Sequence, residues 1–197
     1  PFWIIAIVGI LVSDWGPIFY VATRIGKDNM PFKMYKFRSM RIAKAANEAS
    51  LRPDADRIFA FGNFIRKIQI DELPQLLNIL NGTMSIIGPR PVAKDQFELF
   101  RYGKWNEAAT VPVGLSGPAA LFDFIYGDQI TDPEEYMEKV YPTRRELEYV
   151  YVQKKSMNYD LKMIVYTVIC IFYALFGKEC TWILNELLED AIASKND

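Results

Sequence analysis

The stretch that decides the fold reads IQIDELPQLLNILNGTMSIIGPRP, from Ile68 to Pro91. Asp71 is in a position to cap a helix, with Pro74 tolerated in the first turn and Asn81-Gly82 ending it. The apolar positions of this helix recur with the spacing of a single face: Leu73, Leu76, Leu77 and Leu80. The pattern therefore predicts an amphipathic helix that begins at Asp71.

Asp71 and Glu72 would lie at the positive end of this helix, where unpaired N–H groups and the helix dipole favour anions. A carboxylate held ionised there can attack phosphorus and form an acyl phosphate, provided that cations offset the repulsion between the two anions. Arg90, mounted between two prolines, is a candidate for such a cation. From the residues alone, an acidic first turn followed by an ordinary loop is the commoner explanation of the same pattern.

Composition limits the class of protein. The 197 residues suffice for one domain with a core. A hydrophobic content of 51%, with 13 Phe, 11 Tyr and 4 Trp, indicates apolar surface that meets something other than water. The net charge of -1 provides no global basic field, so we expect no nucleic-acid partner. There is no histidine, which leaves carboxylates as the main candidates for catalysis and argues against zinc.

Two cysteines, Cys170 and Cys180, lie ten residues apart and fit neither a metal-binding nor a redox spacing. We expect two reduced thiols and no structural disulfide. No internal repeat, low-complexity tract or linker divides the chain. The sequence therefore predicts one domain over residues 1–197.

The first twelve residues, PFWIIAIVGILV, form an apolar run that is too short to cross a bilayer, which takes about 20 residues. The run has neither an initiator Met nor a basic leader, so we expect it to begin in the middle of a longer apolar helix. Residues 1–12 are then the remnant of a membrane element, or alternatively a helix buried in the core. Trp15, just after the run, suits a membrane–water interface.

Two short strands are predicted at Ile18–Thr23 and Phe32–Met40, joined by a turn-rich connection of hairpin character. Lys36 and Arg38 in the second strand are two residues apart and should project from one face, where they could hold a diphosphate. A solvated basic edge that discourages strand pairing explains the same spacing. The polar, alanine-rich segment Arg41–Asp56 predicts a surface helix or loop.

The remaining segments are predicted to be mainly helical. Asp132-Pro133 is a favourable helix start, with a cap and Pro at the first position. The charges between Arg144 and Lys155 indicate a solvated helix face, and Met163–Phe176 indicates a buried helix or one lying in the plane of the bilayer surface. Further helices are expected at Val92–Glu107 and Thr181–Ala193.

Three blocks of the sequence resemble the bacterial sugar transferase family, the monotopic polyprenyl-phosphate phosphoglycosyl transferases, in its small single-domain type. They occur in the family's order and at about its spacing: KMYKFRSM (33–40), IDELPQLLNILNGTMSIIGPRP (70–91) and YDLKMI (159–164). The resemblance implies an α+β fold that is mostly helical, with a short β-hairpin, amphipathic interfacial helices and a truncated N-terminal re-entrant membrane helix. Pro1 matches the proline at which that helix bends, and residues 13–197 would form the catalytic globular part.

The resemblance also implies an activity and a location. Such enzymes move a sugar 1-phosphate from a UDP-sugar to a polyprenyl phosphate, the first membrane step of glycoconjugate assembly. They act from one leaflet, at the cytoplasmic face of the bacterial inner membrane. Asp71 would be the nucleophile that forms a covalent phosphosugar intermediate, and Asp71 and Glu72 would hold Mg²⁺. The resemblance assigns substrate phosphates to Lys36, Arg38, Arg66 and Arg90, and the structural turns to Gly88, Pro89, Pro91 and Pro1.

One block departs from the family pattern. In VPVGLSGPAALF (111–122), Pro112 stands where a basic residue is expected and Val113 where proline is expected. The departure removes one expected phosphate contact and favours an alternative, a non-catalytic membrane-associated scaffold or lipid-binding member of the same fold. A soluble nucleotide-sugar enzyme with a core N-terminal helix is a third possibility. The resemblance specifies neither the sugar, nor the polyprenol length, nor the oligomeric state.

Overall fold

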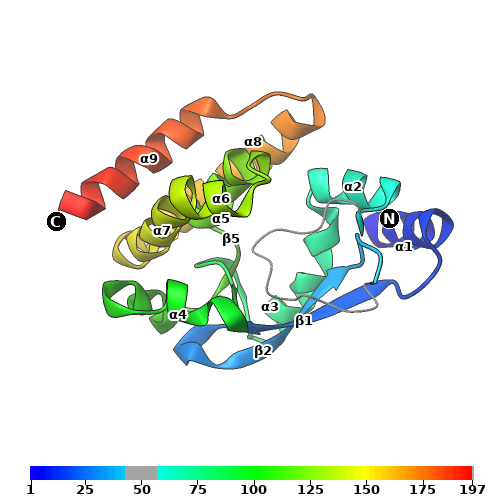
Figure 1. Ribbon diagram of the computed structural model, residues 1–197, viewed down its shortest axis with the longest axis horizontal. Helices are drawn as coiled ribbons and strands as arrows, with labels where there is room; N and C mark the ends of the chain where they lie inside the picture. Colours follow the sequence, from blue (N-terminus) through cyan, green and yellow to red (C-terminus); the bar gives the residue numbers. More distant parts are fainter. Residues whose placement is uncertain (43–56, 197) are drawn as a thin grey trace.

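The computed structural model describes residues 1–42 and 57–196. Helices dominate, and a β-hairpin runs along one side of the molecule (Figure 1), so the predicted α+β class, mostly helical with a short hairpin, is confirmed. Helices α1 (Phe2–Ser13) and α2 (Ala60–Lys67) lie at the opposite end of the molecule from the C-terminus (Figure 1). Most of the predicted surface segment Arg41–Asp56 lies outside the described residues.

Strands β1 (Phe19–Ile25) and β2 (Pro31–Phe37) form the predicted hairpin, with Phe19 opposite Phe37. β4 (Val92–Ala93) pairs with the other edge of β1, and β2 is left as the outer strand. Because β4 directly follows the Gly-Pro-Arg-Pro turn, this pairing brings the turn close to the hairpin. The predicted helix over Val92–Glu107 is wrong in its first part, which is this strand; α4 (Phe97–Phe100) and 3₁₀ turns follow it.

The central segment begins differently from the prediction. Gln69 adopts a left-handed conformation, φ 58°, and starts a 3₁₀ turn over Ile70–Gln75 that continues into α3 (Leu76–Leu80). Asp71 therefore lies inside the first turn and makes no capping hydrogen bond, and its prediction as the cap is wrong. The turn starts one residue earlier than expected, so the Asp71 side chain lies buried inside the protein instead of over the helix end.

The buried face of α3 is polar. Asn78 is 0% exposed; its amide nitrogen donates to the Lys33 carbonyl at 2.7 Å, and its carbonyl oxygen accepts from the Tyr35 N–H at 3.1 Å. One side chain thus satisfies two backbone groups at the outer edge of β2, which would otherwise stay unpaired. The leucine face is turned outward instead, and Leu80 is 84% exposed.

Asn78→Ala should lower the free energy of unfolding by about 1–3 kcal/mol, because it leaves buried backbone groups of β2 without partners. Chemical denaturation of the purified protein measures this loss. Asn63→Ala, at an exposed position of α2, is the matched control and should change stability by less than about 0.5 kcal/mol. Equal effects of the two substitutions would contradict the role given to Asn78.

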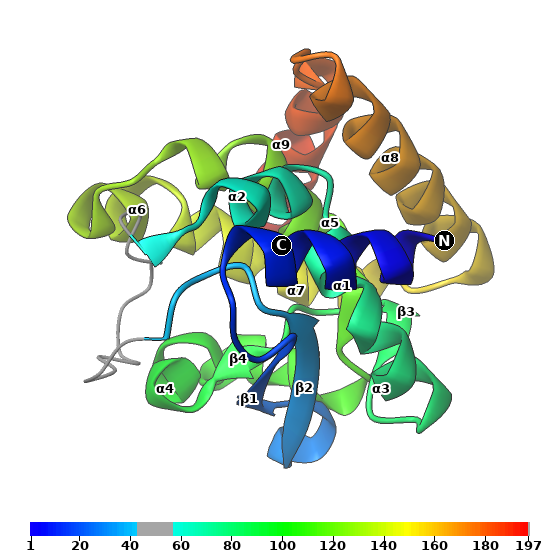
Figure 2. The ribbon, with the colours of Figure 1, turned by 90° about the vertical axis from the view of Figure 1, so that its right-hand side faces the viewer.

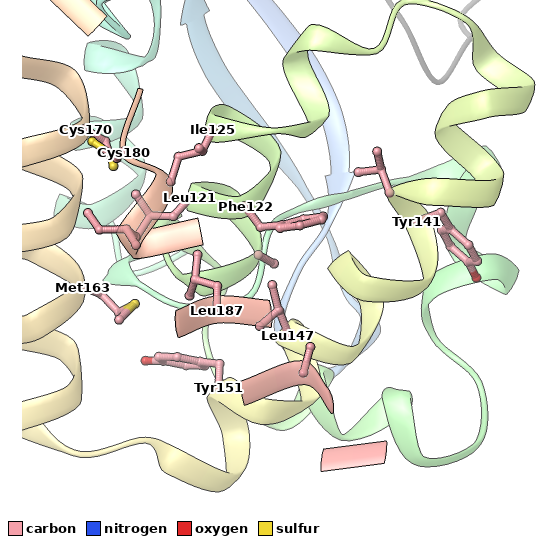
Figure 3. Close-up of a cluster of buried hydrophobic side chains, with 14 of the residues drawn as sticks. Leu121, Phe122, Ile125, Tyr141, Leu147, Tyr151, Met163, Cys170, Cys180 and Leu187 are labelled. Carbon is pink, nitrogen blue, oxygen red and sulfur yellow. The ribbon is translucent and has the colours of Figure 1, made fainter. Parts of the chain in front are cut away.

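The main core lies among the C-terminal helices. Figure 3 shows Leu121, Phe122, Leu147, Tyr151 and Leu187 directed toward one another. The helices that surround them are α5 (Pro118–Ile125), α6 (Pro133–Lys139), α7 (Tyr141–Lys154), α8 (Met157–Leu175) and α9 (Thr181–Asn196). The predicted start of α6 is confirmed, since the Asp132 carboxylate accepts from the Glu135 N–H at 2.8 Å. Cys170 and Cys180 are both buried and free.

The prediction that α7 carries its charges on a solvated face is wrong. Arg144, Glu146 and Glu148 are buried. Glu148 lies 2.5 Å from Arg101, and both side chains are 1% exposed. The helix is surrounded on several sides by other elements, so its charged residues pair inside the protein.

Two helices present apolar residues outward. α1 lies across one end of the molecule against α2 (Figure 2), with Ala6 and Ile10 buried and Ile4, Ile5 and Val12 exposed. α1 is therefore not a fully buried core helix. Among the described residues, α8 is the one helix long and apolar enough to cross a membrane, and 22% of its apolar window is buried.

Candidate active site

The two adjacent carboxylates lie where the 3₁₀ turn meets the hairpin. Glu72 accepts from the Lys36 ammonium of β2 at 2.6 Å. Asp71 is buried, and its Oδ1 atom has no hydrogen-bond partner among the residues that the structure describes. A buried carboxylate oxygen without a partner is costly, so it calls for an explanation in terms of a ligand, an ion or water.

The environment separates the acidities of the two carboxyl groups. Burial raises the pKa of Asp71 to about 6, although Lys36 opposes this shift. Burial acts on Glu72 as well, but Lys36, Arg90 and Arg66 outweigh it and hold the pKa of Glu72 below its ordinary value. At neutral pH both groups are ionised, and Asp71 is the more basic of the two. A pair of carboxyl groups with divergent pKa values is typical of an active site.

The Arg90 guanidinium pairs with the buried carboxylate of Asp123, a residue of α5. The Arg90 Nε atom lies 3.7 Å from Asp123 Oδ2, and Arg144 lies 3.6 Å from the same oxygen. The Tyr136 hydroxyl donates to the other oxygen of Asp123 at 2.8 Å. Burial lowers the pKa of Arg90, but Asp123 and Glu72 outweigh it and raise this pKa above its ordinary value. The positive charge of Arg90 is thus stabilised by two carboxylates, those of Asp123 and of Glu72 in the candidate site.

Sequence reasoning missed Asp123. Its one signal is an isolated carboxylate in the otherwise apolar segment PAALFDFI, 118–125. A lone acidic residue in such a segment must find a cation when the helix is buried. The sequence does not say which of the available arginines supplies it.

The Gly-Pro-Arg-Pro turn is fixed by backbone contacts with β5 (Gly114–Ser116), the strand that precedes α5. The Gly88 N–H donates to the Ser116 carbonyl at 2.9 Å, and the Gly114 N–H donates to the Pro89 carbonyl at 2.8 Å. A Cβ atom at Gly88 or Gly114 would overlap the backbone of the opposite segment. These glycines are therefore required by the close approach of two backbones.

The structure also shows where the predicted turn residues Pro1 and Pro91 lie, and where Val113 of the divergent Pro112-Val113 pair lies. Pro1 is the N-cap residue of α1, and Pro91 directly precedes β4. Val113 is fully buried and packs in a cluster with Ala22, Met34 and Met84. Of the two departing residues, Val113 therefore contributes to core packing at this point of the chain.

Six charged residues were predicted at the site. The structure brings five of them together, Asp71, Glu72, Lys36, Arg66 and Arg90, and leaves the Arg38 cation outside. Lys36, Arg66 and Arg90 all act on Glu72, and Lys36 and Arg66 act on Asp71. Arg38 instead pairs with Asp14 and donates to the Pro17 carbonyl at 2.5 Å. These contacts tie the end of α1 to the hairpin, so Lys36 and Arg38 do not form the joint phosphate clamp that their spacing predicted.

Two adjoining pockets lie next to these residues. The smaller, of about 250 Å³, is lined by Glu72 and Arg90 and otherwise mainly by apolar side chains. The larger, of about 600 Å³, is lined by Arg66, Lys67 and Lys178 among others. They share Phe124, Asp128 and Cys170 as a common wall. The smaller pocket next to the candidate site is therefore mainly apolar, and the larger one carries several charged side chains.

The donor set for a metal consists of Asp71 and Glu72. The described residues contain no group of three or more His, Cys, Asp or Glu that could hold a metal ion. Mg²⁺, however, is commonly bound by one or two carboxylates together with substrate phosphates. The free Oδ1 atom of Asp71 beside Glu72 fits an ion that arrives with a diphosphate, and does not fit a complete protein cage.

Two adjacent carboxylates, the cations that act on them and a mainly apolar pocket thus lie together at one place in the fold. Comparison with known proteins shows the family. The chain belongs to the bacterial sugar transferase family, whose model matches residues 1–174, and the predicted resemblance is thereby confirmed.

Several characterised or named proteins are similar to this chain. The UDP-glucose:undecaprenyl-phosphate glucose-1-phosphate transferase of Escherichia coli (strain K12) is 35% identical over 164 residues, which cover 82% of this chain and 34% of that protein. The uncharacterized sugar transferase EpsL of Bacillus subtilis (strain 168) is 35% identical over 164 residues, covering 83% of this chain and 73% of that protein. The UDP-N-acetylgalactosamine-undecaprenyl-phosphate N-acetylgalactosaminephosphotransferase of Aeromonas hydrophila is 42% identical over 102 residues, covering 50% of this chain and 24% of that protein. The chain thus spans about a third of the length of the E. coli relative.

Proposed function

We propose that this protein is a phosphoglycosyl transferase that moves a sugar 1-phosphate from a UDP-sugar to a membrane polyprenyl phosphate. The observation that carries the proposal is the Asp71 carboxylate, which is buried and has an unsatisfied oxygen, beside Glu72 and its ion pair with Lys36. The names of relatives over most of this chain, which include undecaprenyl-phosphate sugar phosphate transferases, support the choice of substrates.

The proposed reaction has two displacements at one phosphorus atom. An oxygen of Asp71 attacks the sugar-bearing phosphorus, the bond from that phosphorus to the UMP oxygen breaks, and UMP leaves with the bonding electrons. A phosphate oxygen of the polyprenyl phosphate then attacks the same phosphorus and the bond to Asp71 breaks. The products are a diphosphate-linked sugar and the original carboxylate.

The residues around Asp71 would perform the electrostatic part of this reaction. Phosphoryl transfer depends mainly on positioning and charge neutralisation. Lys36, Arg66 and Arg90 would offset the repulsion between the carboxylate and the diphosphate, and Glu72 keeps Lys36 in place at 2.6 Å. Mg²⁺, when bound by Asp71 and Glu72, would supply further neutralisation of the diphosphate.

The apolar faces of α1 and α8 support a place at the membrane. We propose that residues 1–12 belong to a re-entrant helix and that the protein acts monotopically, from the cytoplasmic face of the bacterial inner membrane. Trp15, which follows α1, is 86% exposed, as expected for an interfacial anchor. Recovery of the full-length gene product in the soluble fraction, without detergent, would contradict this location.

The rate of UMP release should fall as the pH is lowered through about 6. Asp71 attacks only when it is ionised, and its pKa is raised to about 6. Well below that value, each unit of pH should reduce the rate by about tenfold. The measurement is the initial rate of UMP release between pH 4.5 and 8 in the presence of Mg²⁺, and a rate that remains constant down to pH 4.5 would exclude Asp71 as the ionised nucleophile.

One assay distinguishes the transferase hypothesis from the non-catalytic alternative. The protein is incubated in detergent with undecaprenyl phosphate, Mg²⁺ and each member of a panel of UDP-sugars. The transferase releases UMP and forms a lipid-linked sugar with at least one donor. A folded protein that releases no UMP with any donor would favour the scaffold or lipid-binding alternative. The observation that favours that alternative is Pro112, which stands where the family has a basic residue.

A further inference from the structure

The smaller pocket lies beside the dyad, between the 3₁₀ turn, β3 (Ser85–Ile87), α5 and α8. Its charged lining residues are Glu72, Arg90 and Asp128, and Arg90 is the one cation among them. Most of its other walls are apolar side chains, among them Ile68, Leu73, Leu121, Phe124, Ile164 and Ile171. The pocket thus places one arginine among mainly hydrophobic walls.

The hydroxyl groups in this pocket are already engaged with one another. Ser116 Oγ and Thr167 Oγ1 lie 2.7 Å apart, and Thr167 also donates to the Met163 carbonyl at 2.7 Å. A pocket that recognises a nucleobase or a sugar needs polar groups directed at the ligand. The larger pocket, with Arg66, Lys67 and Lys178, offers such groups. The smaller one is therefore suited to a ligand that is anionic at one end and apolar along its length.

The mouth of the pocket continues onto an apolar surface. Ile86 and Val168 line the pocket and are 52% and 62% exposed. Val168 belongs to an exposed stripe along α8 that also contains Leu161, Val165 and Phe172. At about 250 Å³ the pocket is smaller than the sites that enclose drug-sized ligands, so a long chain would leave it along this stripe.

We propose that this pocket binds the isoprene units of the lipid acceptor that lie nearest its phosphate, with the phosphate at Arg90 and the remaining chain leaving past Ile86 and Val168. The proposal rests on the proposed transferase function, which supplies the identity of the acceptor. It gives the two substrates separate compartments, which share a wall at Phe124, Asp128 and Cys170.

A bulky residue at the mouth tests the proposal. Val168→Trp should narrow the entrance, and because this side chain is exposed the substitution should leave the fold intact. Ile192→Trp is the matched control: its side chain is also exposed, at 59%, but it lies on α9, away from the stripe, and does not line the pocket. The protein is first loaded with a UDP-sugar, and the loss of the sugar phosphate adduct is then followed by intact mass after addition of undecaprenyl phosphate.

We expect Val168→Trp to slow acceptor-dependent loss of the adduct by about tenfold or more, equivalent to about 1.4 kcal/mol, and to affect adduct formation much less. Ile192→Trp should resemble the native protein in both steps. Native acceptor-dependent loss in Val168→Trp, or an equal defect in both steps, would overturn the proposal; the second result would instead assign the pocket to the donor.

A binding probe separates this proposal from the proposed function. A farnesyl phosphate that carries a diazirine in its first isoprene unit should label peptides from α5 or α8, and Val168→Trp should reduce that labelling. Because labelling needs no turnover, it would still support the pocket if no UDP-sugar gave an adduct, in which case the transferase function alone would fail. Labelling of peptides from neither helix would overturn the pocket assignment.

Discussion

Asp71→Asn should abolish transfer while making the protein more stable at neutral pH. The substitution removes the anionic oxygen that attacks phosphorus, and we expect UMP release to fall by at least about 1000-fold, or about 4 kcal/mol of transition-state stabilisation. The same change removes a buried charge. The two effects have opposite directions, which distinguishes loss of a nucleophile from loss of the fold.

The sign of the stability effect follows from the pKa. Burial raises the pKa of Asp71 to about 6 in the folded protein, so folding favours the protonated form. The favourable contribution is complete at pH values below the ordinary range of an aspartate and is lost as the pH rises through about 6. Above that pH the ionised group destabilises the fold by up to about 3 kcal/mol, which asparagine should recover in part.

Urea denaturation at pH 4.5 and 7.5 measures the stability effect, and the gain should be present only at the higher pH. Glu72→Gln is the matched control in the adjacent position. Its pKa is held below the ordinary value, chiefly by Lys36 acting against burial, so this substitution should destabilise the protein at pH 7.5. Stabilisation by Glu72→Gln equal to that by Asp71→Asn would contradict the electrostatic difference between the two carboxylates.

Glu148→Ala should lower the free energy of unfolding by about 3–5 kcal/mol, because it leaves the buried Arg101 cation without its counter-charge. Glu148 lies 2.5 Å from Arg101, and the Nε and Nη2 atoms of that arginine have no hydrogen-bond partner in the described part of the chain. For a protein of this size the loss corresponds to a decrease in Tm of roughly 6–20 °C. Differential scanning calorimetry measures it.

Glu135→Ala provides the comparison for this effect. Glu135 pairs with Lys139 at 2.8 Å on α6, but both side chains are about half exposed. Its removal should change stability by less than about 1 kcal/mol, since solvent replaces an exposed partner at little cost. A decrease in Tm for Glu148→Ala no greater than that for Glu135→Ala would show that the buried pair does not stabilise the fold.

Local sequence signals predicted those parts of the fold that local interactions determine. The hairpin follows from two β-rich runs around a turn, and α6 begins where Asp132 provides a cap. The periodicity of α3 was misleading because its leucines are exposed, while Asn78 is buried to pair with the edge of β2. Hydrophobic periodicity identifies a helix, but it cannot show that a sheet edge elsewhere requires an amide.

The sequence predicted most charged residues of the candidate site, but it did not predict Asp123, the residue that supports Arg90. The adjacent carboxylates and the cations Lys36, Arg66 and Arg90 converge as expected, because they lie on elements that meet at the turn. Arg38 was assigned to the site by the family resemblance, yet it pairs with Asp14, more than twenty residues away in the sequence. Asp123 reaches Arg90 only through tertiary packing, which no spacing in the sequence encodes.

The most direct test of the central claim is the intact mass of the native protein after incubation with UDP-sugars and Mg²⁺ in the absence of acceptor. With a suitable donor, the mass should increase by one sugar phosphate, peptide mapping should place the increase on Asp71, and undecaprenyl phosphate should remove it. Turnover of donor and acceptor without any adduct, or an adduct that maps to a residue other than Asp71, would contradict the account.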